Sequence, residues 1–341
     1  MLARIVATRT AGGPRVDERF CGLSLMTRAL LVAQSRGALQ IEVVANDEDL
    51  PSVSAAMEDS RLRVPVTLVA TPTVDAELTL TYDEVADVRL VDDATRRLAK
   101  RRLFEACRKP VDGVISRHLN RHVSIFISKS LVDAPVSPNA MTAATFSLSL
   151  VAAAFAVRGG YWPTLAAAFL MQWNSILDGC DGELARVRHQ GSKLGQWLDT
   201  IGDDWSNVIF WASLGYGARE IPELGPSLAV CGAIGATGNA LAALANYAVL
   251  ARLGSGDFYA LDANASKARR GLVGRTIGVV ELVLKQDFFL FLMLVLAALG
   301  VLHQALVAIA LGAVVTCINS TVRAITFFVR RDRSARDPRA R

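Results

Sequence analysis

The sequence predicts a mainly α-helical membrane protein, in which six transmembrane helices follow a small cytosolic α/β domain. Two observations support this prediction. Hydrophobic residues make up 52% of the 341 residues and the mean hydropathy is +0.33, which is high for a cytosolic enzyme. The charge is also divided unevenly, because acidic and basic residues are mixed up to about residue 139 and long charge-free runs follow. The chain is therefore expected to have a soluble part and a membrane part.

Strand-like and helix-like patterns alternate in residues 1–95. The stretches ARIVA, QIEVVAN and PVTLVA are typical of buried strands, whereas SLMTRALLVAQSRGA and LPSVSAAMEDSRL are typical of helices. This alternation predicts an α/β layer with a parallel sheet. The first residues, MLARIVATRTAGGPR, lack the apolar core of a secretory signal, so this domain is expected to stay in the cytoplasm.

A basic linker, residues 96–138, contains the stretch DGVISRHLNRHVSIFISKSL. At helical spacing, apolar side chains gather on one face of this stretch and polar ones mainly on the other: Ile115, Leu119, Val123, Phe126 and Ile127 against Arg117, Arg121, Ser124 and Ser128. The pattern predicts an amphipathic helix, and a membrane interface is favoured over packing on the soluble domain because a predicted span follows closely. Asn139 is expected to cap that span.

Residues 139–330 contain runs that are apolar enough to cross a bilayer, which takes about 20 residues each. Six helices are expected, at about residues 141–157, 161–177, 197–217, 226–250, 286–302 and 304–329. The last two come from one charge-free run that is too long for a single span and is expected to turn near Gly300–Gln304. A buried helical core in a soluble protein is the disfavoured alternative, because these runs alternate with basic loops.

Basic residues concentrate in the loop at residues 251–285, in the tail at residues 331–341, and between the second and third predicted helices. The positive-inside rule therefore places both termini, and the loop between the second and third predicted helices, in the cytoplasm.

Nucleic acid is not an expected partner, because the net charge of +5 is modest and no basic patch is interleaved with aromatics. Five scattered cysteines without a C-x-x-C pair argue against a disulfide framework and a structural zinc site.

The stretch LDGCDGELARVRHQGSKLGQWLDTIGDD, residues 177–204, crowds carboxylates between two predicted spans. Asp178 and Asp181 are three residues apart at the end of one helix, and Asp199 and Asp203 are four apart at the start of the next. Each pair shares a helix face, and the short turn brings both pairs together, where they would repel without a cation. Mg²⁺ takes such oxygen ligands and usually shares them with phosphate groups, and two ions can clamp both oxygens of a phosphoryl displacement.

The spacing D-x-x-D-G-x-x-A-R-x8-G-x3-D-x3-D in this stretch resembles the signature of the CDP-alcohol phosphotransferase (phosphatidyltransferase) family of integral membrane enzymes. The resemblance implies a six-helix bundle that transfers a substituted phosphate group from a CDP-alcohol to a hydroxyl and releases CMP. It implies Mg²⁺ ligands at Asp178, Asp181, Asp199 and Asp203, with two ions expected and Mn²⁺ as a substitute. Asp203 is then also the general base for the acceptor hydroxyl. The CDP-binding residues are expected to be Asp178, Gly182, Ala185, Arg186, Gly195 and Asn139.

Composition alone supports other interpretations of the same residues. Gly182, Ala185 and Gly195 would then serve close helix packing, and Arg186 would anchor the loop at the membrane surface. A transporter or a membrane anchor for the soluble domain is the alternative from another class, but neither needs the Gly/Ala/Arg frame, and transporter acids would lie near the mid-membrane.

Two further resemblances concern the substrates. The first 95 residues resemble sugar-nucleotide nucleotidyltransferases, but VATRTAGGPR lacks their glycine spacing, so this domain is expected to be catalytically inactive. The stretch from RKPVDGVISRHLN to VSPNAMT resembles enzymes that join CDP-inositol to inositol phosphate. This implies CDP-inositol or CDP-diacylglycerol as donor and a polyol or polyol phosphate, such as inositol phosphate, as acceptor. A phospholipid synthase that makes phosphatidylinositol phosphate or phosphatidylglycerol phosphate from CDP-diacylglycerol is the rival within the family.

An acceptor phosphate would need cationic partners, and Arg275 and Arg323 are the candidates. Arg323 lies inside a predicted span, where a charge is costly unless it serves a cavity or reaches the membrane surface. Membrane lipids and a second copy in a homodimer are the expected partners. The domains are expected at residues 1–95 (α/β), 96–138 (linker and interfacial helix), 139–330 (transmembrane bundle) and 331–341 (basic cytosolic tail).

Overall fold

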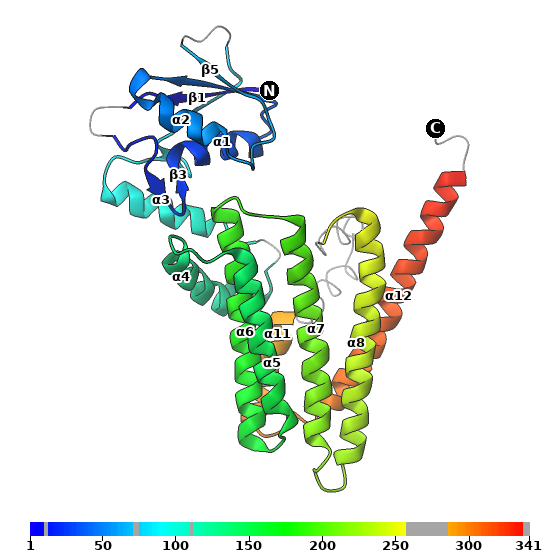
Figure 1. The fold of residues 1–341 in the computed structure, drawn as a ribbon. Coiled ribbons are helices and arrows are strands. Elements are labelled where there is room, and N and C mark those ends of the chain that lie inside the picture. Colours follow the sequence, from blue (N-terminus) through cyan, green and yellow to red (C-terminus); the bar gives the residue numbers. More distant parts are fainter. Residues whose placement is uncertain (10–12, 71–74, 110–111, 257–285, 337–341) are drawn as a thin grey trace, which may run out of the picture. The chain divides into compact units, whose positions relative to one another are not determined.

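The computed structural model describes residues 1–9, 13–70, 75–109, 112–256 and 286–336 (Figure 1). Among these residues the chain forms two compact units. The α/β unit comprises Met1–Pro110, Ile125–Val136 and Glu183–Gln190, and the helical unit comprises Val111–Ser124, Ser137–Gly182 and Gly191–Arg341. The short turn between the two halves of the acidic motif therefore belongs to the α/β unit.

The described part of the α/β unit is built on a four-stranded parallel sheet in the order β5–β4–β1–β6. Its strands are β1 (Leu2–Ala7), β4 (Gln40–Ala45), β5 (Val66–Val69) and β6 (Leu78–Thr81). Helix α1 (Leu25–Ser35) follows β1 along the chain, and α2 (Leu50–Met57) follows β4 after the 3₁₀ turn η1 (Asp47–Asp49). The predicted parallel α/β arrangement is confirmed.

Strand β6 and two short hairpins were not expected from the sequence. The hairpins pair β2 (Arg19–Phe20) with β3 (Leu23–Ser24), and β7 (Glu84–Val85) with β8 (Val88–Arg89). β6 does carry a strand signal, because its sequence LTLT alternates apolar and β-branched polar residues. The hairpin strands are two residues long, which is too short for any periodicity to show.

The basic linker contains helix α3 (Asp93–Glu105), the π-helical turn η2 (Ser116–Asn120) and helix α4 (Arg121–Leu131). α3 begins at a capping box, in which Asp92 and Thr95 satisfy each other's backbone N–H groups. In η2 and α4 the apolar side chains Leu119 and Phe126 are 40% and 71% exposed, whereas Ser124 and Ser128 are buried. A helix that packs its apolar face on a soluble core would show the opposite pattern.

The helices expected in the membrane part are present at each predicted position in the described residues. They are α5 (Pro138–Val157), α6 (Tyr161–Val187), α7 (Lys193–Ala218), α8 (Gly225–Leu253), α11 (Gln286–Ala298) and α12 (Leu306–Arg336). Among the described residues three segments are long and apolar enough to cross a membrane, namely Pro138–Val157, Gly225–Leu253 and Leu306–Val329, and α11 is a shorter apolar helix. These three helices suit a membrane protein by their length and composition, and six spans remain a prediction.

Small residues allow these helices to approach closely. α7 packs against α5 and α8, and α8 against α12 (Figure 1). A Cβ atom on Gly217 of α7 would lie 2.1 Å from the carbonyl oxygen of Ala156 in α5. A Cβ on Gly232 of α8 would lie 2.4 Å from the Cα of Gly215 in α7. Backbone contacts of this kind are typical of helix pairs in membranes, where close packing replaces the hydrophobic effect.

The ends of the helices differ from the sequence prediction in two places. α6 does not end near residue 177 but continues to Val187, so the first half of the motif is helical throughout; ELARV contains good helix formers. The cap of α5 is Ser137 and not Asn139, because Pro138 occupies the first helical position and the Ser137 hydroxyl accepts the Ala140 N–H at 3.1 Å. The predicted turn after α11 is confirmed, with Gly300 at φ +74°.

Candidate active site

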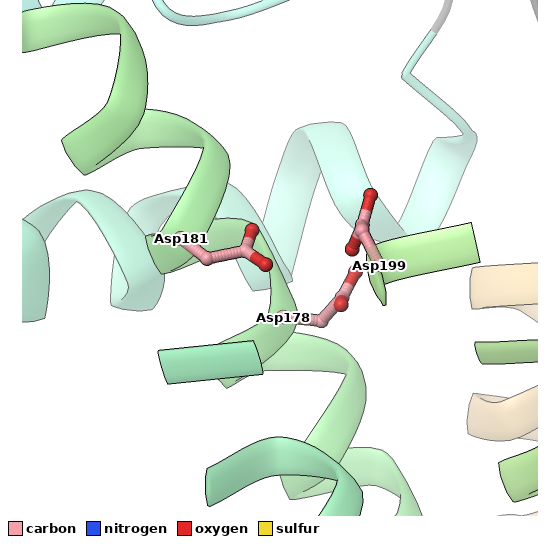
Figure 2. Close-up of side chains that lie close together, drawn as sticks. All are labelled: Asp178, Asp181 and Asp199. Atoms are coloured by element: carbon pink, nitrogen blue, oxygen red, sulfur yellow. The ribbon is translucent and has the colours of Figure 1, made fainter. Parts of the chain in front are cut away.

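Three motif aspartates converge in the described part of the helical unit. Asp178 and Asp181 come from α6 and Asp199 comes from α7, and one carboxylate oxygen of each lies within 4.8 Å of the other two (Figure 2). Asp181 is buried, and Asp178 and Asp199 are half-buried. The three-residue spacing on α6 turns both carboxylates to one face, and the antiparallel return of α7 brings the third one to them.

A hydrogen bond from α5 orients the middle carboxylate. The hydroxyl of Thr142 donates to one Asp181 oxygen at 2.5 Å, and the backbone N–H of Gly182 donates to the other. Asp181 is therefore held by groups that fix its direction, as is common for carboxylates that bind a metal. Thr142 was not among the residues predicted from the sequence, because its position one turn into α5 carries no motif.

Asp203 lies one turn beyond Asp199 on α7 and is half-buried. Its carboxylate is not part of the group of three among the described residues, but its charge acts on Asp178 and on Asp199. Asp203 is therefore close enough to the cluster for its charge to act on two of the three members.

The donor set fits a hard divalent cation. All three converging groups are carboxylates, which supply the oxygen ligands that Mg²⁺ prefers, and no softer nitrogen or sulfur ligand belongs to the group found in the described residues. Like charges held this close repel one another unless a cation lies between them. The geometry thus supports a divalent metal site formed by α6 and α7.

Two of the predicted CDP-binding residues meet beside this cluster. A Cβ atom on Gly195, one turn before Asp199, would lie 3.0 Å from the side-chain oxygen of Asn139 in α5. The same Cβ atom would lie 3.1 Å from the hydroxyl oxygen of Ser192, which caps α7 by accepting the Gly195 N–H at 2.9 Å. Gly195 therefore leaves room where the first turns of α5 and α7 approach each other.

The remaining predicted residues are placed less directly. Gly182 follows Asp181 on α6, and Ala185 and Arg186 lie in the last turn of the same helix, in the segment that belongs to the α/β unit. Arg186 is exposed and donates to the carbonyl oxygen of Cys107 at 3.4 Å. Arg323 lies on α12 with an exposed side chain, and Arg275 lies outside the described residues.

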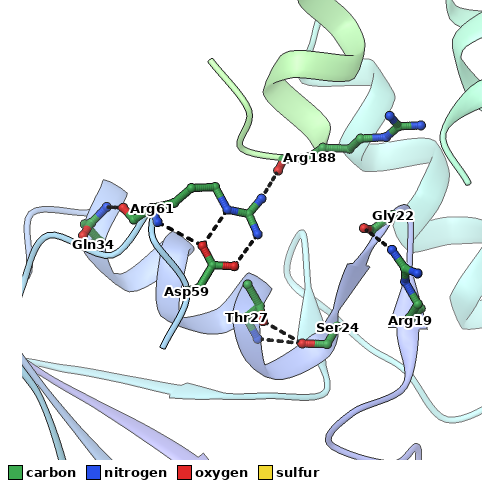
Figure 3. A network of polar contacts seen from close by, with 8 residues as sticks. All are labelled: Arg19, Gly22, Ser24, Thr27, Gln34, Asp59, Arg61 and Arg188. Atoms are coloured by element: carbon green, nitrogen blue, oxygen red, sulfur yellow. Dashed lines mark hydrogen bonds and ion pairs between the residues drawn. The ribbon is translucent and has the colours of Figure 1, made fainter. Parts of the chain in front are cut away.

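The α/β unit has a polar hollow of its own, with a volume of about 480 Å³. It is lined by Asp17, Arg19, Gly22, Leu23, Ser24, Thr27, Arg61 and Gln190. Figure 3 shows its main contacts: Arg61 pairs with Asp59 and donates to the carbonyl oxygen of Arg188 at 2.8 Å, and Ser24 accepts the Thr27 N–H at 3.1 Å. Residues 10–12 of the VATRTAGGPR stretch lie outside the described residues.

A comparison with protein families identifies the helical unit. The family described as CDP-alcohol phosphatidyltransferase matches residues 135–318, which is more than half of the chain and includes every motif aspartate. The chain belongs to the CDP-alcohol phosphatidyltransferase family. The family is one of transferases that take a CDP-alcohol as donor and an alcohol as acceptor, and its members generally use divalent metal ions.

Curated relatives match over a shorter region. The chain is 37% identical over 150 residues to a "Bifunctional IPC transferase and DIPP synthase" of Archaeoglobus fulgidus, covering 44% of this chain and 27% of the relative. Proteins of the same name from Aquifex aeolicus and Thermococcus kodakarensis are 40% and 42% identical over 129 and 111 residues. These matches cover 38% and 33% of this chain and 28% and 24% of the relatives. The chain thus spans about a quarter of the length of the relatives that it matches.

Proposed function

We propose that this enzyme catalyses the Mg²⁺-dependent transfer of a substituted phosphate group from CDP-inositol or CDP-diacylglycerol to a polyol phosphate, with release of CMP. Inositol phosphate is the proposed acceptor. The observation that carries the proposal is the convergence of Asp178, Asp181 and Asp199 within a family-specific motif. The relatives are named as DIPP synthases, and this supports the same activity in the helical unit.

The proposed mechanism assigns each aspartate a role. Asp178, Asp181 and Asp199 would hold the metal, with two ions proposed and Asp203 as a further ligand, and Mg²⁺ bound there would supply positive charge to the diphosphate. Thr142 keeps Asp181 directed at the site through its 2.5 Å hydrogen bond. The carboxylate of Asp203 takes the proton of the acceptor hydroxyl. The hydroxyl oxygen then bonds to the phosphorus that carries the donor alcohol, and the bond from that phosphorus to the oxygen of the leaving CMP breaks.

Binding of the nucleotide is proposed for Asp178, Gly182, Ala185, Arg186, Gly195 and Asn139. The close approach of Gly195 to Asn139 supports this assignment for two of them, because it brings both residues together at the first turns of α5 and α7, one turn before Asp199. Arg275 and Arg323 are the proposed partners of the acceptor phosphate. An arginine suits this task because its guanidinium group stays charged and can bind a phosphate through two parallel hydrogen bonds.

In the membrane we propose six spans, with both termini and the active site at the cytoplasmic side, and a homodimer. The turn η2 and helix α4 would lie in the interface, in contact with lipid. The exposed Leu119 and Phe126 support this placement, because an apolar face turned outward is stabilised where it meets acyl chains.

The α/β unit is proposed to be catalytically inactive and to serve assembly. Two buried or half-buried arginines of this unit bind the turn that joins α6 to α7: Arg28 donates to the carbonyl oxygen of Val187 at 2.9 Å, and Arg61 to that of Arg188. These bonds support a role in holding the turn that connects the two halves of the motif.

The rival function is a phospholipid synthase that uses CDP-diacylglycerol and makes phosphatidylinositol phosphate or phosphatidylglycerol phosphate. The family description favours it, because it names a phosphatidyl group as the one transferred.

A donor–acceptor panel tests the proposal. The purified full-length protein in detergent is given CDP-inositol or CDP-diacylglycerol with inositol, inositol phosphate or glycerol phosphate, and products are detected by mass. We expect CMP release with inositol phosphate that stops when EDTA removes the metal and returns with Mg²⁺. A product only from CDP-diacylglycerol, with inositol phosphate or with glycerol phosphate, would favour the rival, and no CMP release from any donor would overturn the proposal.

A further inference from the structure

A buried arginine from outside the motif packs on helix α6, next to the residue that follows Asp178. Arg121 is the first residue of α4 and is only 9% exposed. Its Nε donates to one carboxylate oxygen of Asp112 and its Nη2 to the other, both at 3.0 Å. Asp112 is also buried, so the pair is bidentate and removed from water.

The rest of the Arg121 guanidinium group faces the motif helix. A Cβ atom built on Gly179, the residue that follows Asp178, would lie 2.9 Å from Arg121 Nη1 and 3.2 Å from Ser124 Oγ. The thiol of Cys180, the next residue, donates to the Ser124 carbonyl oxygen at 3.5 Å. The start of α4 thus packs on Gly179 and Cys180 of α6, the two residues between Asp178 and Asp181 in the sequence.

The charge of Arg121 also acts on the carboxylate of Asp178. That carboxylate is surrounded by Asp181, Asp199 and Asp203, all of the same sign. A fixed cation near Asp178 offsets part of this repulsion.

We propose that Arg121 is a positioning residue of the metal site. Through its packing on Gly179 and its charge, it holds Asp178 in the direction in which the three aspartates share a cation, and Asp112 fixes Arg121 in turn. This inference rests on the metal-dependent function proposed above.

Two energetic arguments favour this role over a purely structural one. Replacing a buried ion pair by well-packed apolar residues of similar volume is often neutral or even stabilising, so folding alone gives no reason for Arg121 and Asp112 at this point. Glycine inside a helix costs about 1 kcal/mol relative to alanine, and Gly179 is the residue type that leaves room for the guanidinium group.

Binding of Mn²⁺, measured as free ion by electron paramagnetic resonance on the full-length protein in detergent, tests the inference. Arg121→Gln removes the guanidinium group. Gly179→Ala leaves every charge in place, but the added methyl group displaces the guanidinium group of Arg121. We expect both variants to bind Mn²⁺ about 10- to 100-fold more weakly, the range typical of lost groups that orient metal ligands. Arg121→Lys keeps the charge but cannot donate two parallel hydrogen bonds to Asp112, so its affinity for Mn²⁺ should lie between those of the other two variants and the wild type.

The matched control is Gly312→Ala on α12, where a Cβ atom meets nothing within 4 Å. It should bind Mn²⁺ like the wild type. If Arg121→Gln does not fold, Asp112→Asn/Arg121→Gln removes the carboxylate left without its partner and takes its place in the test.

Each other outcome overturns the inference. Tighter Mn²⁺ binding in Arg121→Gln would mean that the arginine only repels the metal, and unchanged binding with a lower unfolding midpoint would mean that it only supports the fold. These results leave the proposed function intact as long as the wild type binds Mn²⁺ and releases CMP. Conversely, a wild type that binds Mn²⁺ but releases CMP from no donor contradicts the proposed function alone.

Discussion

The buried arginines of the α/β unit and the clustered aspartates of the helical unit use charge in opposite ways. In the α/β unit, Arg28 and Arg188 are 2% and 5% exposed and donate to backbone carbonyl oxygens. In the helical unit, three carboxylates of the same sign lie within 4.8 Å of one another among the described residues. Charge that the chain compensates with its own groups builds structure, whereas like charges held together need a ligand from outside. The arginines of the α/β unit thus form a structural hydrogen-bond network, whereas the aspartates of the helical unit form a candidate metal site.

The largest expected effect concerns the functional side of this comparison. Asp203→Asn keeps the size of the side chain and removes the base, so kcat should fall about 10²- to 10⁴-fold. Because Asp178, Asp181 and Asp199 remain, Mn²⁺ binding should change much less than kcat. CMP release and Mn²⁺ binding are measured on the same preparation.

The neighbouring Asp204 provides a matched control, since it lies outside the motif frame. The fold-loss in kcat should be less than about a tenth as large for Asp204→Asn as for Asp203→Asn. Equal losses in both variants would show that overall charge on α7, and not a base at one position, sets the rate.

Arg188→Ala should have the largest effect on stability. The guanidinium group donates to a set of carbonyl oxygens around the end of α4, those of Leu131, Val132, Ala134 and Val136. A buried acceptor left without a donor costs about 1–3 kcal/mol, so several at once should lower the free energy of unfolding by at least about 3 kcal/mol. Chemical denaturation of the full-length protein measures this.

Arg188→Lys sharpens the same test. The ammonium group keeps the charge but cannot reach acceptors on several sides, so stability should lie between those of the wild type and Arg188→Ala. Equal stability of the wild type and Arg188→Ala would contradict the view that the arginines of the α/β unit are structural.

In the helical unit away from the aspartates, size and not charge should decide stability. Gly217→Ala places a Cβ atom 2.1 Å from the Ala156 carbonyl oxygen, which is backbone and cannot move aside. Overpacking of this kind costs about 1–3 kcal/mol. The unfolding midpoint in detergent should fall for Gly217→Ala and stay the same for Gly312→Ala, and equal midpoints would mean that α5 and α7 separate easily.

The smallest expected effect is a pH dependence in the α/β unit. Burial, together with the charges of Arg28 and Arg61, lowers the pKa of His189 from its ordinary value of 6.5 to about 4. The unfolded chain therefore takes up the proton first, so this stability contribution is present above pH 6.5 and is lost as pH falls toward 4.

His189→Asn should flatten this dependence. His189 has φ +49°, a left-handed conformation that asparagine tolerates, so the substitution adds little strain. Unfolding midpoints at pH 7.5 and pH 5 should differ less in the variant than in the wild type. An unchanged difference would assign the pH dependence to other groups.

The success of prediction differed between the two parts of the chain for physical reasons. Long apolar runs predicted the helix positions well, because a helix of some 20 residues averages over local exceptions. β6 was missed although it alternates, and the two hairpins rest on strands of two residues that no window resolves. The end of α6 was placed at residue 177 because the prediction followed hydropathy, while helix formation continued through polar residues to Val187.

The sequence by itself determined that Asp178 and Asp181 share a helix face, because a helical repeat of 3.6 residues turns them to one side whatever surrounds them, and the motif indicated the family. It also determined the apolar helices and the parallel α/β layer. Only the tertiary structure decided which groups contact the motif residues. Thr142, 39 residues before Asp181, donates to its carboxylate, and Arg121, 58 residues before Gly179, packs on that glycine. Both contacts depend on how α4, α5 and α6 pack. Local spacing carries no information on contacts made across such distances along the chain.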